Sequence, residues 1–340
     1  MLRLTWLSAL SMVIASPLTA QIQTDTPAGI PNRITLRRPT PEAGRTRVYV
    51  GLYILDISQI NDVEQSMTAD FAVRVGWHDP RLATDEPGVR TFKVDEIWHP
   101  RLMVFNARRL WKTWPEVFQV DEDGNVQYRQ RYYGTLTARL DLHDFPFDRN
   151  TIMVRFLAAG YSTDELELII DESVTGRAPD FSLVDASVGE GTAVTGSFFF
   201  APSGTELPSL SYEFEVRRHT AYYLWKIILP LTIIVFMSWL VFWIDPTQFG
   251  PQIGLAATAV LTLIAYRFLL GQLVPRISYL TRLDIFIMGA TILVFLGMVE
   301  AVAVARIAQK RERLARRIDG VSRVAFPCAF VVVTYLAFFA

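Results

Sequence analysis

The chain has 340 residues, with 33 basic and 34 acidic side chains and a formal net charge of −1. This length leaves room for two domains, and the balanced charge argues against nucleic acid as a partner. A single cysteine, Cys328, excludes an intrachain disulfide and a cysteine-based metal site. The charged residues gather in the first two thirds of the chain, whereas the last third is mostly apolar.

The first 20 residues have the pattern of a secretory signal. Arg3 precedes an apolar run, Leu4–Ala15, and Ser16-Pro17-Leu18-Thr19-Ala20 follows. A basic start, an apolar stretch and small residues before a cut are typical of a signal peptide. We therefore expect residues 1–20 to be removed after Ala20, although an uncleaved anchor helix remains the alternative. In either case the segment that follows is exported.

Residues 21–218 are predicted to form an extracellular or periplasmic domain made of strands. Short alternating runs with turn residues between them are typical of a β-sandwich. The expected strands are Arg47–Ile57, Thr68–Trp77, Gly134–Leu142, Thr151–Leu157 and Leu210–Val216. A loose glycine cluster, Gly189, Gly191 and Gly196, lacks the lysine of a phosphate loop and is interpreted as a connection between strands.

The exported domain carries no motif that argues for an enzyme. Its histidines are scattered, and neither an HExxH nor a GxSxG arrangement occurs. The acids Asp121 and Asp123 adjoin Gly124 and read as a turn. We therefore expect no catalytic residues, no metal site and no cofactor.

Residues 219–340 are predicted to form a bundle of four transmembrane helices, at about 222–243, 252–273, 285–305 and 321–340. Aromatic residues at both ends of the first span suit the two membrane interfaces. Pro230 should bend this span, and neighbouring helices can bond the carbonyl that it frees. The loop 306–320 holds Lys310, Arg311, Arg313, Arg316 and Arg317, and such a basic loop belongs in the cytoplasm. The predicted fold is an extracellular all-β sandwich followed by a four-helix bundle in the plasma (inner) membrane.

The second span carries a graded stripe on one face. Alternating gaps of four and three place its members on one side of a helix: Gly254, Thr258, Leu261, Ala265, Phe268 and Gln272. A helix that lines a narrow water path can use such a stripe, because hydrophobic rings gate pores by dewetting. The alternative is a buried helix whose small residues let its neighbours pack closely. Periodicity alone leaves both readings open.

Several ordered motifs resemble the pentameric ligand-gated ion channel (Cys-loop receptor) family, in particular its bacterial members. Phe145-Pro146-Phe147-Asp148 is similar to the core of the signature loop, and Ala138 and Ile152 occupy the positions of the two cysteines of animal members. Further similar segments are Leu55–Ser58, Trp77–Leu82, Trp98–Pro100 with Phe105-Asn106, Leu210–Pro230 and Pro275–Tyr279. Together these motifs cover nearly the whole mature chain.

The resemblance implies a homopentamer in membrane lipid, with a pore for inorganic ions and a small-molecule agonist bound between neighbouring sandwiches. The agonist residues that it implies are Phe105, Tyr161, Phe198, Phe199 and Phe200. Aromatic side chains favour a cationic amine. Ala72 and Ala159 occupy positions where many members of the family have aromatic residues. The set of aromatic side chains that the resemblance implies around the agonist is therefore incomplete.

The resemblance also implies a coupling zone between the two domains. Its members are Asn61, Asp62, Val63, Phe145, Pro146, Phe147, Asp148, Arg218, Pro275, Arg276 and Tyr279, the last three within the linker Leu273–Asp284. Within it we expect an ion pair between Asp148 and Arg218. Gly250-Pro251-Gln252 stands where cation-selective members carry Glu, which favours anion or weak selectivity. The predicted function is a ligand-gated ion channel, and the alternative is a membrane-anchored sensor that conducts no ions.

Overall fold

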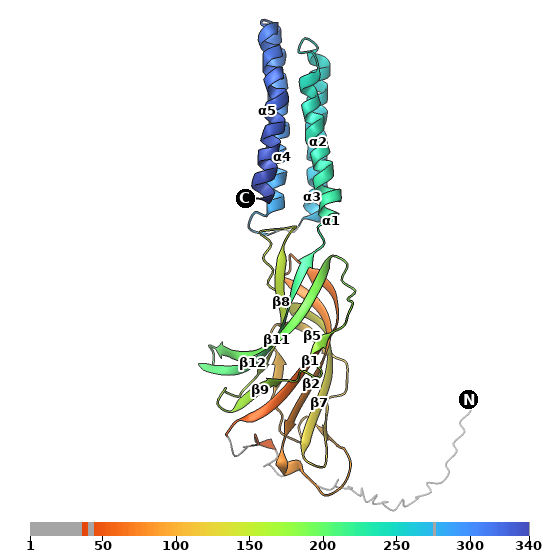
Figure 1. Ribbon diagram of the computed structural model, residues 1–340, viewed down its shortest axis with the longest axis vertical. Helices are drawn as coiled ribbons and strands as arrows, with labels where there is room; N and C mark the ends of the chain where they lie inside the picture. Colours follow the sequence, from red (N-terminus) through yellow and green to blue (C-terminus); the bar gives the residue numbers. More distant parts are fainter. Residues whose placement is uncertain (1–35, 40–43, 275–276, 340) are drawn as a thin grey trace, which may run out of the picture.

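The computed structural model describes residues 36–39, 44–274 and 277–339, in two parts joined end to end. One part is built from strands and the other from long helices, and the helices rise from one end of the strand domain (Figure 1). The predicted order, a β-sandwich followed by four spanning helices, is confirmed. The predicted signal peptide, residues 1–20, lies outside the described residues.

The strand domain consists of two sheets. The larger sheet has the order β10-β1-β2-β7-β6-β3, with β9 on β1 and β5 on β7, and the smaller one has the order β11-β12-β8-β4. The strand bounds are β1 Thr46–Asn61, β2 Ser66–His78, β3 Arg90–Lys93, β4 Leu102–Val104, β5 Ala107–Lys112, β6 Val117–Val120, β7 Asn125–Thr137, β8 Arg149–Ala158, β9 Leu166–Ile170, β10 Gly176–Arg177, β11 Ala186–Phe200 and β12 Thr205–Arg218. A 3-10 turn, η2 Pro80–Leu82, follows β2.

Alternating burial along the strands builds the core between the two sheets. In β2 every second residue from Met67 to Trp77 is buried, as expected for a strand with one face on a core. Val154 and Phe156 of β8 and Tyr212 and Phe214 of β12 are buried in the other sheet. The hydrophobic pattern that predicted these strands is therefore the pattern that forms the core.

Two predictions for the sandwich are wrong. The expected strand Gly134–Leu142 ends at Thr137, because Ala138 N and Leu140 N bond Gln65 instead of a neighbouring strand. The glycine cluster is not a connection, since it lies within β11. A Cβ on Gly191 would lie 2.2 Å from Tyr212 Cζ, so the glycine leaves room for that ring. Glycine inside a strand often marks such a close approach.

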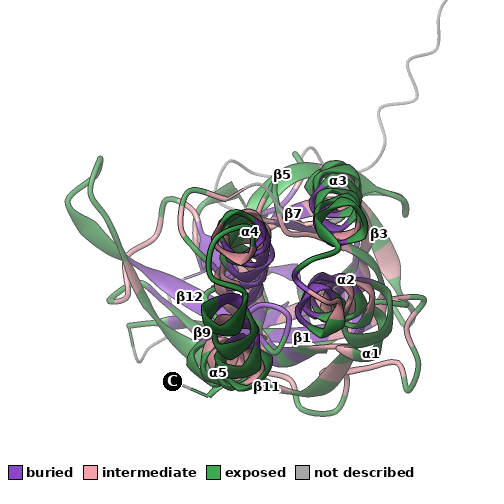
Figure 2. Cartoon of the chain, turned by 90° about the horizontal axis from the view of Figure 1, so that it is seen from above, coloured by how far each residue is buried: buried purple, intermediate pink, exposed green. Residues whose placement is uncertain are grey.

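Four helices are long and apolar enough to cross a membrane. The first consists of α1 Ala221–Tyr223, a π-helical turn η3 Leu224–Ile228, α2 Leu229–Trp239 and a 3-10 turn η4 Leu240–Trp243; the others are α3 Phe249–Leu273, α4 Arg282–Ala308 and α5 Glu312–Phe338. Seen from above, the four rods bury the sides that face one another (Figure 2). As predicted, a neighbour covers the carbonyl freed by Pro230, because Tyr266 Oη donates to Lys226 O at 3.1 Å.

The predicted basic loop 306–320 is largely wrong. α4 continues to Ala308 and α5 begins at Glu312, so only Gln309–Arg311 connects them. Arg316 lies on α5 and bonds Glu312 one turn earlier at 2.6 Å. Arginine and glutamate are good helix formers, and pairs four residues apart stabilise a helix. The basic residues therefore extend the last helix instead of forming a loop.

Candidate functional site

The predicted stripe lies on an open side of α3. Leu261 is 68% exposed and Phe268 is 77% exposed, which is high for large apolar side chains in a packed bundle. Gly254, Thr258 and Ala265 are exposed as well. The side chain of Gln272 lies outside the described residues. Among the described helices of one subunit, none covers these five positions.

The opposite side of α3 packs into the subunit. Ala256, Ala259, Leu263 and Leu270 are all buried, and Gln252 is fully buried with no hydrogen-bond partner for its amide among the described residues. The small residues that pack α3 against its neighbours thus lie on this side, not on the stripe. The reading of the stripe as a packing surface within the subunit is therefore wrong.

Two of the predicted agonist residues are in contact with each other. The rings of Phe105, which follows β4, and Phe198, near the end of β11, are 4.5 Å apart. Phe105 is 38% exposed, so this pair is not part of the core. The register of the last hairpin is settled by the pairing of Phe198 with Leu207 and of Phe200 with Thr205. Phe199 follows Phe198 in β11, so its side chain lies on the opposite face of the strand, and it is 61% exposed.

Tyr161 is held by the core. Its hydroxyl accepts a hydrogen bond from Trp98 Nε1 at 2.7 Å, and the two rings are 5.7 Å apart. Trp98 is only 3% exposed. Two residues further on, Thr163 N donates to Glu206 O, which places this segment beside the hairpin that carries the three phenylalanines. The structure thus brings the three predicted segments to one side of the sandwich.

The face around Ala72 carries charged side chains together with one aromatic ring, because Tyr53 stands opposite Ala72 in the β1–β2 ladder. Ala72 stands opposite Arg131 in the β2–β7 ladder. Arg131 Nε bonds Asp70 at 2.9 Å, and Arg74 Nε bonds Asp171 at 3.1 Å. Charge-assisted pairs of this kind hold guanidinium groups in a fixed orientation. Ordered charged groups therefore lie around Ala72, the position at which many members of the family have an aromatic residue.

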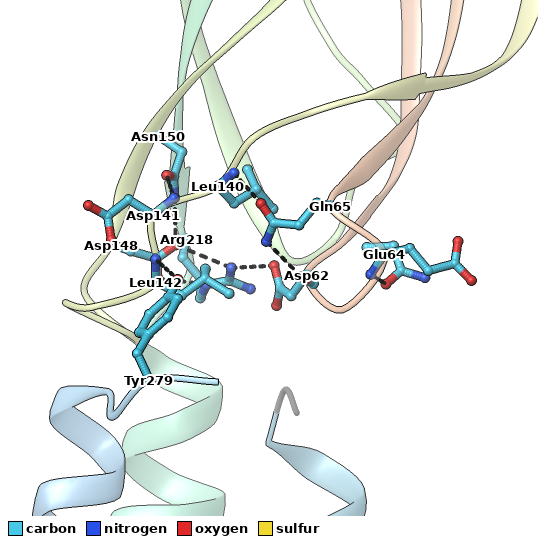
Figure 3. A network of polar contacts seen from close by, with 11 residues as sticks. Asp62, Glu64, Gln65, Leu140, Asp141, Leu142, Asp148, Asn150, Arg218 and Tyr279 are labelled. Atoms are coloured by element: carbon cyan, nitrogen blue, oxygen red, sulfur yellow. Dashed lines mark hydrogen bonds and ion pairs between the residues drawn. The ribbon is translucent and has the colours of Figure 1, made fainter. Parts of the chain in front are cut away.

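Arg218 is the centre of the junction between the domains. Its Nε bonds Asp148 at 2.9 Å and its Nη2 bonds Asp62 at 2.7 Å, so the ion pair expected between Asp148 and Arg218 is present (Figure 3). The Arg218 guanidinium also lies over the Phe145 ring, 4.9 Å from its centre. Burial by itself lowers the pKa of Arg218, but bonds to Asp148 and Asp62 outweigh it and raise the pKa above its usual value.

This cluster is buried, unlike most surface ion pairs. The side chains of Arg218, Asp148 and Asp62 are 11%, 3% and 14% exposed. Asn150 Nδ2 donates to the second oxygen of Asp148 at 2.9 Å, so both oxygens of the carboxylate accept hydrogen bonds. Removing one member of a buried pair leaves an uncompensated charge, which costs about 3–5 kcal/mol. The cluster therefore ties the loop after β1, the segment 138–148 and the end of β12 into one unit.

The loop after β1 is held in place by Gln65, one of two non-glycine residues with positive φ among those described. Gln65 Nε2 donates to Asp62 O at 2.9 Å, and its Oε1 accepts from Leu140 N at 2.7 Å (Figure 3). The first bond closes the loop, and the second fixes the loop against the segment 138–148. Of the other predicted coupling residues, Asn61 at the end of β1 accepts from Glu64 N through its side-chain oxygen, and Val63 is 58% exposed.

A second set of contacts joins the same segment to the helices. Tyr279 Oη accepts from Leu142 N at 3.0 Å, and its ring stacks on His143 at 4.1 Å. Arg282 Nε donates to Asp144 at 2.7 Å, and its Nη1 donates to Phe338 O at the end of α5. Phe147, the most exposed residue of the motif 145–148, packs edge-on against Phe338. The predicted residues Pro275 and Arg276 lie outside the described residues.

The sequence analysis gave no coupling role to His143 and Asp144, and it included Arg282 only as part of the linker Leu273–Asp284. One signal could have found the last of these. Thr281 and Asp284 form a capping box, in which each side chain bonds the backbone of the other residue. This pattern marks the start of a helix, and it would have placed Arg282 on the first turn of α4, next to the loop.

Two family models match the chain. The model described as the neurotransmitter-gated ion-channel ligand binding domain matches residues 34–220. The model described as the neurotransmitter-gated ion-channel transmembrane region matches residues 227–314. The first match covers the sandwich with its junction, and the second covers the first three spanning helices and the first residues of α5.

Known relatives agree with these matches. The chain is 26% identical to a proton-gated ion channel of Gloeobacter violaceus over 298 residues, which are 86% of this chain and 82% of the relative. It is 27% identical to the gamma-aminobutyric acid receptor subunit beta-4 of Gallus gallus over 282 residues, which are 77% of this chain and 56% of that subunit. The chain thus spans just over half the length of the chicken subunit.

Proposed function

The chain belongs to the neurotransmitter-gated ion-channel family and is a multi-pass membrane subunit of a pentameric ligand-gated channel, and from this premise we propose that five identical copies surround a pore lined by α3. The observation that carries the proposal is the open stripe on α3, with Leu261 at its middle. Five such stripes would face one another and cover the apolar side chains that one subunit leaves bare.

The proposed agonist site lies between neighbouring sandwiches. One subunit supplies Phe105, Phe198 and Tyr161, and its neighbour supplies the face around Ala72. The aromatic side suits a cation, whereas the charged side offers both signs, so an amine and an amino acid are both candidates. One relative named above is a proton-gated channel, and the other is named for gamma-aminobutyric acid. The first set of candidate agonists to test therefore includes steps to acidic pH and gamma-aminobutyric acid.

Agonist binding is proposed to reach the pore through the junction. The cluster around Arg218 holds segment 138–148 to the sandwich, while Tyr279 and Arg282 hold it to the helices. A ligand that favours one arrangement of this segment would then favour one state of the helices. Asp245, the nearest acid to the inner end of α3, bonds Arg316 at 3.2 Å and so contributes little free charge. We propose anion or weak selectivity on that basis.

Recording from purified protein in planar bilayers tests the proposal. We expect a current in response to at least one member of a panel of amines, amino acids and pH steps, with a reversal potential that does not follow the cation gradient alone. A membrane-anchored sensor is the second candidate. A protein that binds a member of the panel and passes no current under any condition would favour it.

A further inference from the structure

Two acids lie inside the helical bundle, and no step of the proposed gating uses them. Glu300 is on α4 and is half-buried, and Asp319 is on α5 and is only 1% exposed. Both carboxylate oxygens of each acid are buried and have no hydrogen-bond partner among the described residues. Nearly all buried polar groups in proteins have a partner, and an exception of this kind can mark a bound ion. Acids inside a membrane-spanning bundle point to a function for the same reason.

The two carboxylates are neighbours. Glu300 interacts electrostatically with Asp319 and also with the hydroxyl of Ser322, which follows Asp319 by three residues on α5 and is 7% exposed. Two negative charges repel each other strongly in a medium of low dielectric, and a buried charge without a partner is costly. The pair therefore needs a further positive charge to remain buried.

One cation close to the pair is already bonded elsewhere. Arg323, one turn after Asp319, donates from Nε to Phe242 O at 2.9 Å, and its guanidinium lies over the Trp243 ring, 5.5 Å from the centre. Its charge acts favourably on Asp319, whereas the charge of Asp245 opposes it. One arginine offsets one of the two carboxylates, so net negative charge remains at the pair.

The pair lies near the end of the bundle that faces away from the sandwich. Glu300 is eight residues before the end of α4, and Asp319 is seven residues after the start of α5. At 1.5 Å per residue, the two acids are about 12 Å and about 10 Å from the turn Gln309–Arg311. Gln252, in the first turn of α3 at the same end, has a fully buried amide that also lacks a partner among the described residues. Three helices thus carry unpaired polar groups towards the cytoplasmic side.

We propose that Glu300 and Asp319 bind a Mg²⁺ ion that enters from the cytoplasm and keeps part of its water shell. The part of the chain that the structure describes contains no group of three or more acid, histidine or cysteine side chains that could hold a metal ion. A cation that needs a full set of protein ligands therefore does not fit, whereas Mg²⁺ usually keeps several waters and binds through one or two carboxylates. The Ser322 hydroxyl is a further oxygen donor. The bound ion neutralises the pair and joins α4 to α5.

Thermal unfolding and calorimetric titration of purified full-length protein test this site. When MgCl₂ is added to chelator-treated protein at constant ionic strength, we expect saturable binding of one ion per chain. The unfolding midpoint should rise by about 3 °C or more at saturation. Asp319→Asn should weaken Mg²⁺ binding about tenfold or more and abolish this rise. In chelator alone, the same variant should unfold at a higher temperature than native protein, because one of the two buried charges is gone.

A second variant and a control accompany this experiment. Glu300→Gln should behave as Asp319→Asn does, and it keeps the test decisive if Asp319→Asn does not assemble. The matched control is Glu312→Gln, which removes an acid at the start of the same helix that is 52% exposed and pairs with Arg316. Its Mg²⁺ affinity and its rise in unfolding midpoint should equal those of native protein.

Three results would overturn the proposal. The first is the absence of saturable Mg²⁺ binding to native protein. The second is equal stabilisation of native protein and both acid variants by Mg²⁺, which indicates binding at other sites only. The third is a gain in stability of Asp319→Asn that is the same with and without Mg²⁺, as expected for a proton shared by the two acids. An effect of Mg²⁺ on gating rests on the proposed function, but binding does not. Because no current is recorded, failure here leaves the channel proposal standing, and a silent channel leaves this one standing.

Discussion

Leu261 is the residue on which the proposed gate depends. Five leucine side chains in a ring would leave water in the pore without hydrogen bonds, so the closed pore empties. Leu261→Thr adds a hydroxyl per subunit that favours the wet state by about 0.5 kcal/mol. Five of them give roughly 2.5 kcal/mol, or about a 60-fold shift towards opening. Macroscopic currents should show leak without agonist or a response at far lower agonist concentration.

Leu263 provides the comparison for this experiment. It lies on the same helix but is only 1% exposed, on the side that packs into the subunit. Leu263→Thr should lower the amount of assembled protein without opening the pore, so currents are normalised to surface protein. Equal leak in both variants, or none in Leu261→Thr, would mean that the stripe does not gate.

Phe105 carries the prediction for the agonist site. Phe105→Ala removes one ring of the exposed pair with Phe198, and we expect the agonist concentration for half-maximal current to rise about tenfold or more, as for aromatic anchors in binding sites. Tyr161→Ala should act in the same direction. Single-channel conductance should not change, because neither residue is near the helices. Trp114→Ala, at an exposed aromatic outside the predicted agonist set, is the control, and unaltered responses in both Phe105→Ala and Tyr161→Ala would place the site elsewhere.

At the scale of elements, the segment 138–148 is the link between sheet and helices. Arg218→Gln leaves Asp148 buried and uncompensated, so we expect a loss of about 3–5 kcal/mol in folded stability. Adding Asp148→Asn should restore part of it, since Asp62 is then the only acid of the cluster that has lost its partner. Thermal unfolding of the purified single and double variants measures this coupling.

The neighbouring residue supplies the control. Arg217 is 58% exposed and lies 3.5 Å from Glu215, so Arg217→Gln should change stability by less than about 1 kcal/mol. If Arg218→Gln lowers folded stability no more than Arg217→Gln does, the buried cluster does not stabilise the junction as its burial indicates.

The long strand β11 depends on one glycine for its fit on β12. Gly191→Ala would drive a methyl group into the Tyr212 ring, and we expect a loss of about 1–3 kcal/mol, as for other overpacked sites. Gly196→Ala is matched in strand and chemistry, but its nearest neighbour is Ser209 Oγ at 3.7 Å. Denaturant unfolding should separate the two variants, and equal midpoints would contradict the packing argument.

At the scale of the whole molecule, the subunit is incomplete by itself. It exposes an apolar stripe on α3 and only half of the proposed agonist site. Native mass measurement in mild detergent should give five chains. A stable monomer that survives dilution without losing its fold would contradict both the pore and the shared agonist site.

Local patterns in the sequence were sufficient for the two-part architecture, because alternation and long apolar runs reflect burial that each element achieves in any context. Motif resemblance led to Arg218 and Asp148 but not to Asp62 as a second partner of Arg218, nor to His143 and Arg282. Arg218 meets residues 70 and 156 positions away, and no local pattern encodes such distances. The sequence also left open which side of α3 stays bare, and it misplaced the start of α5. Only the packing of the helices decided both, since exposure depends on which neighbours are present and not on the composition of the helix.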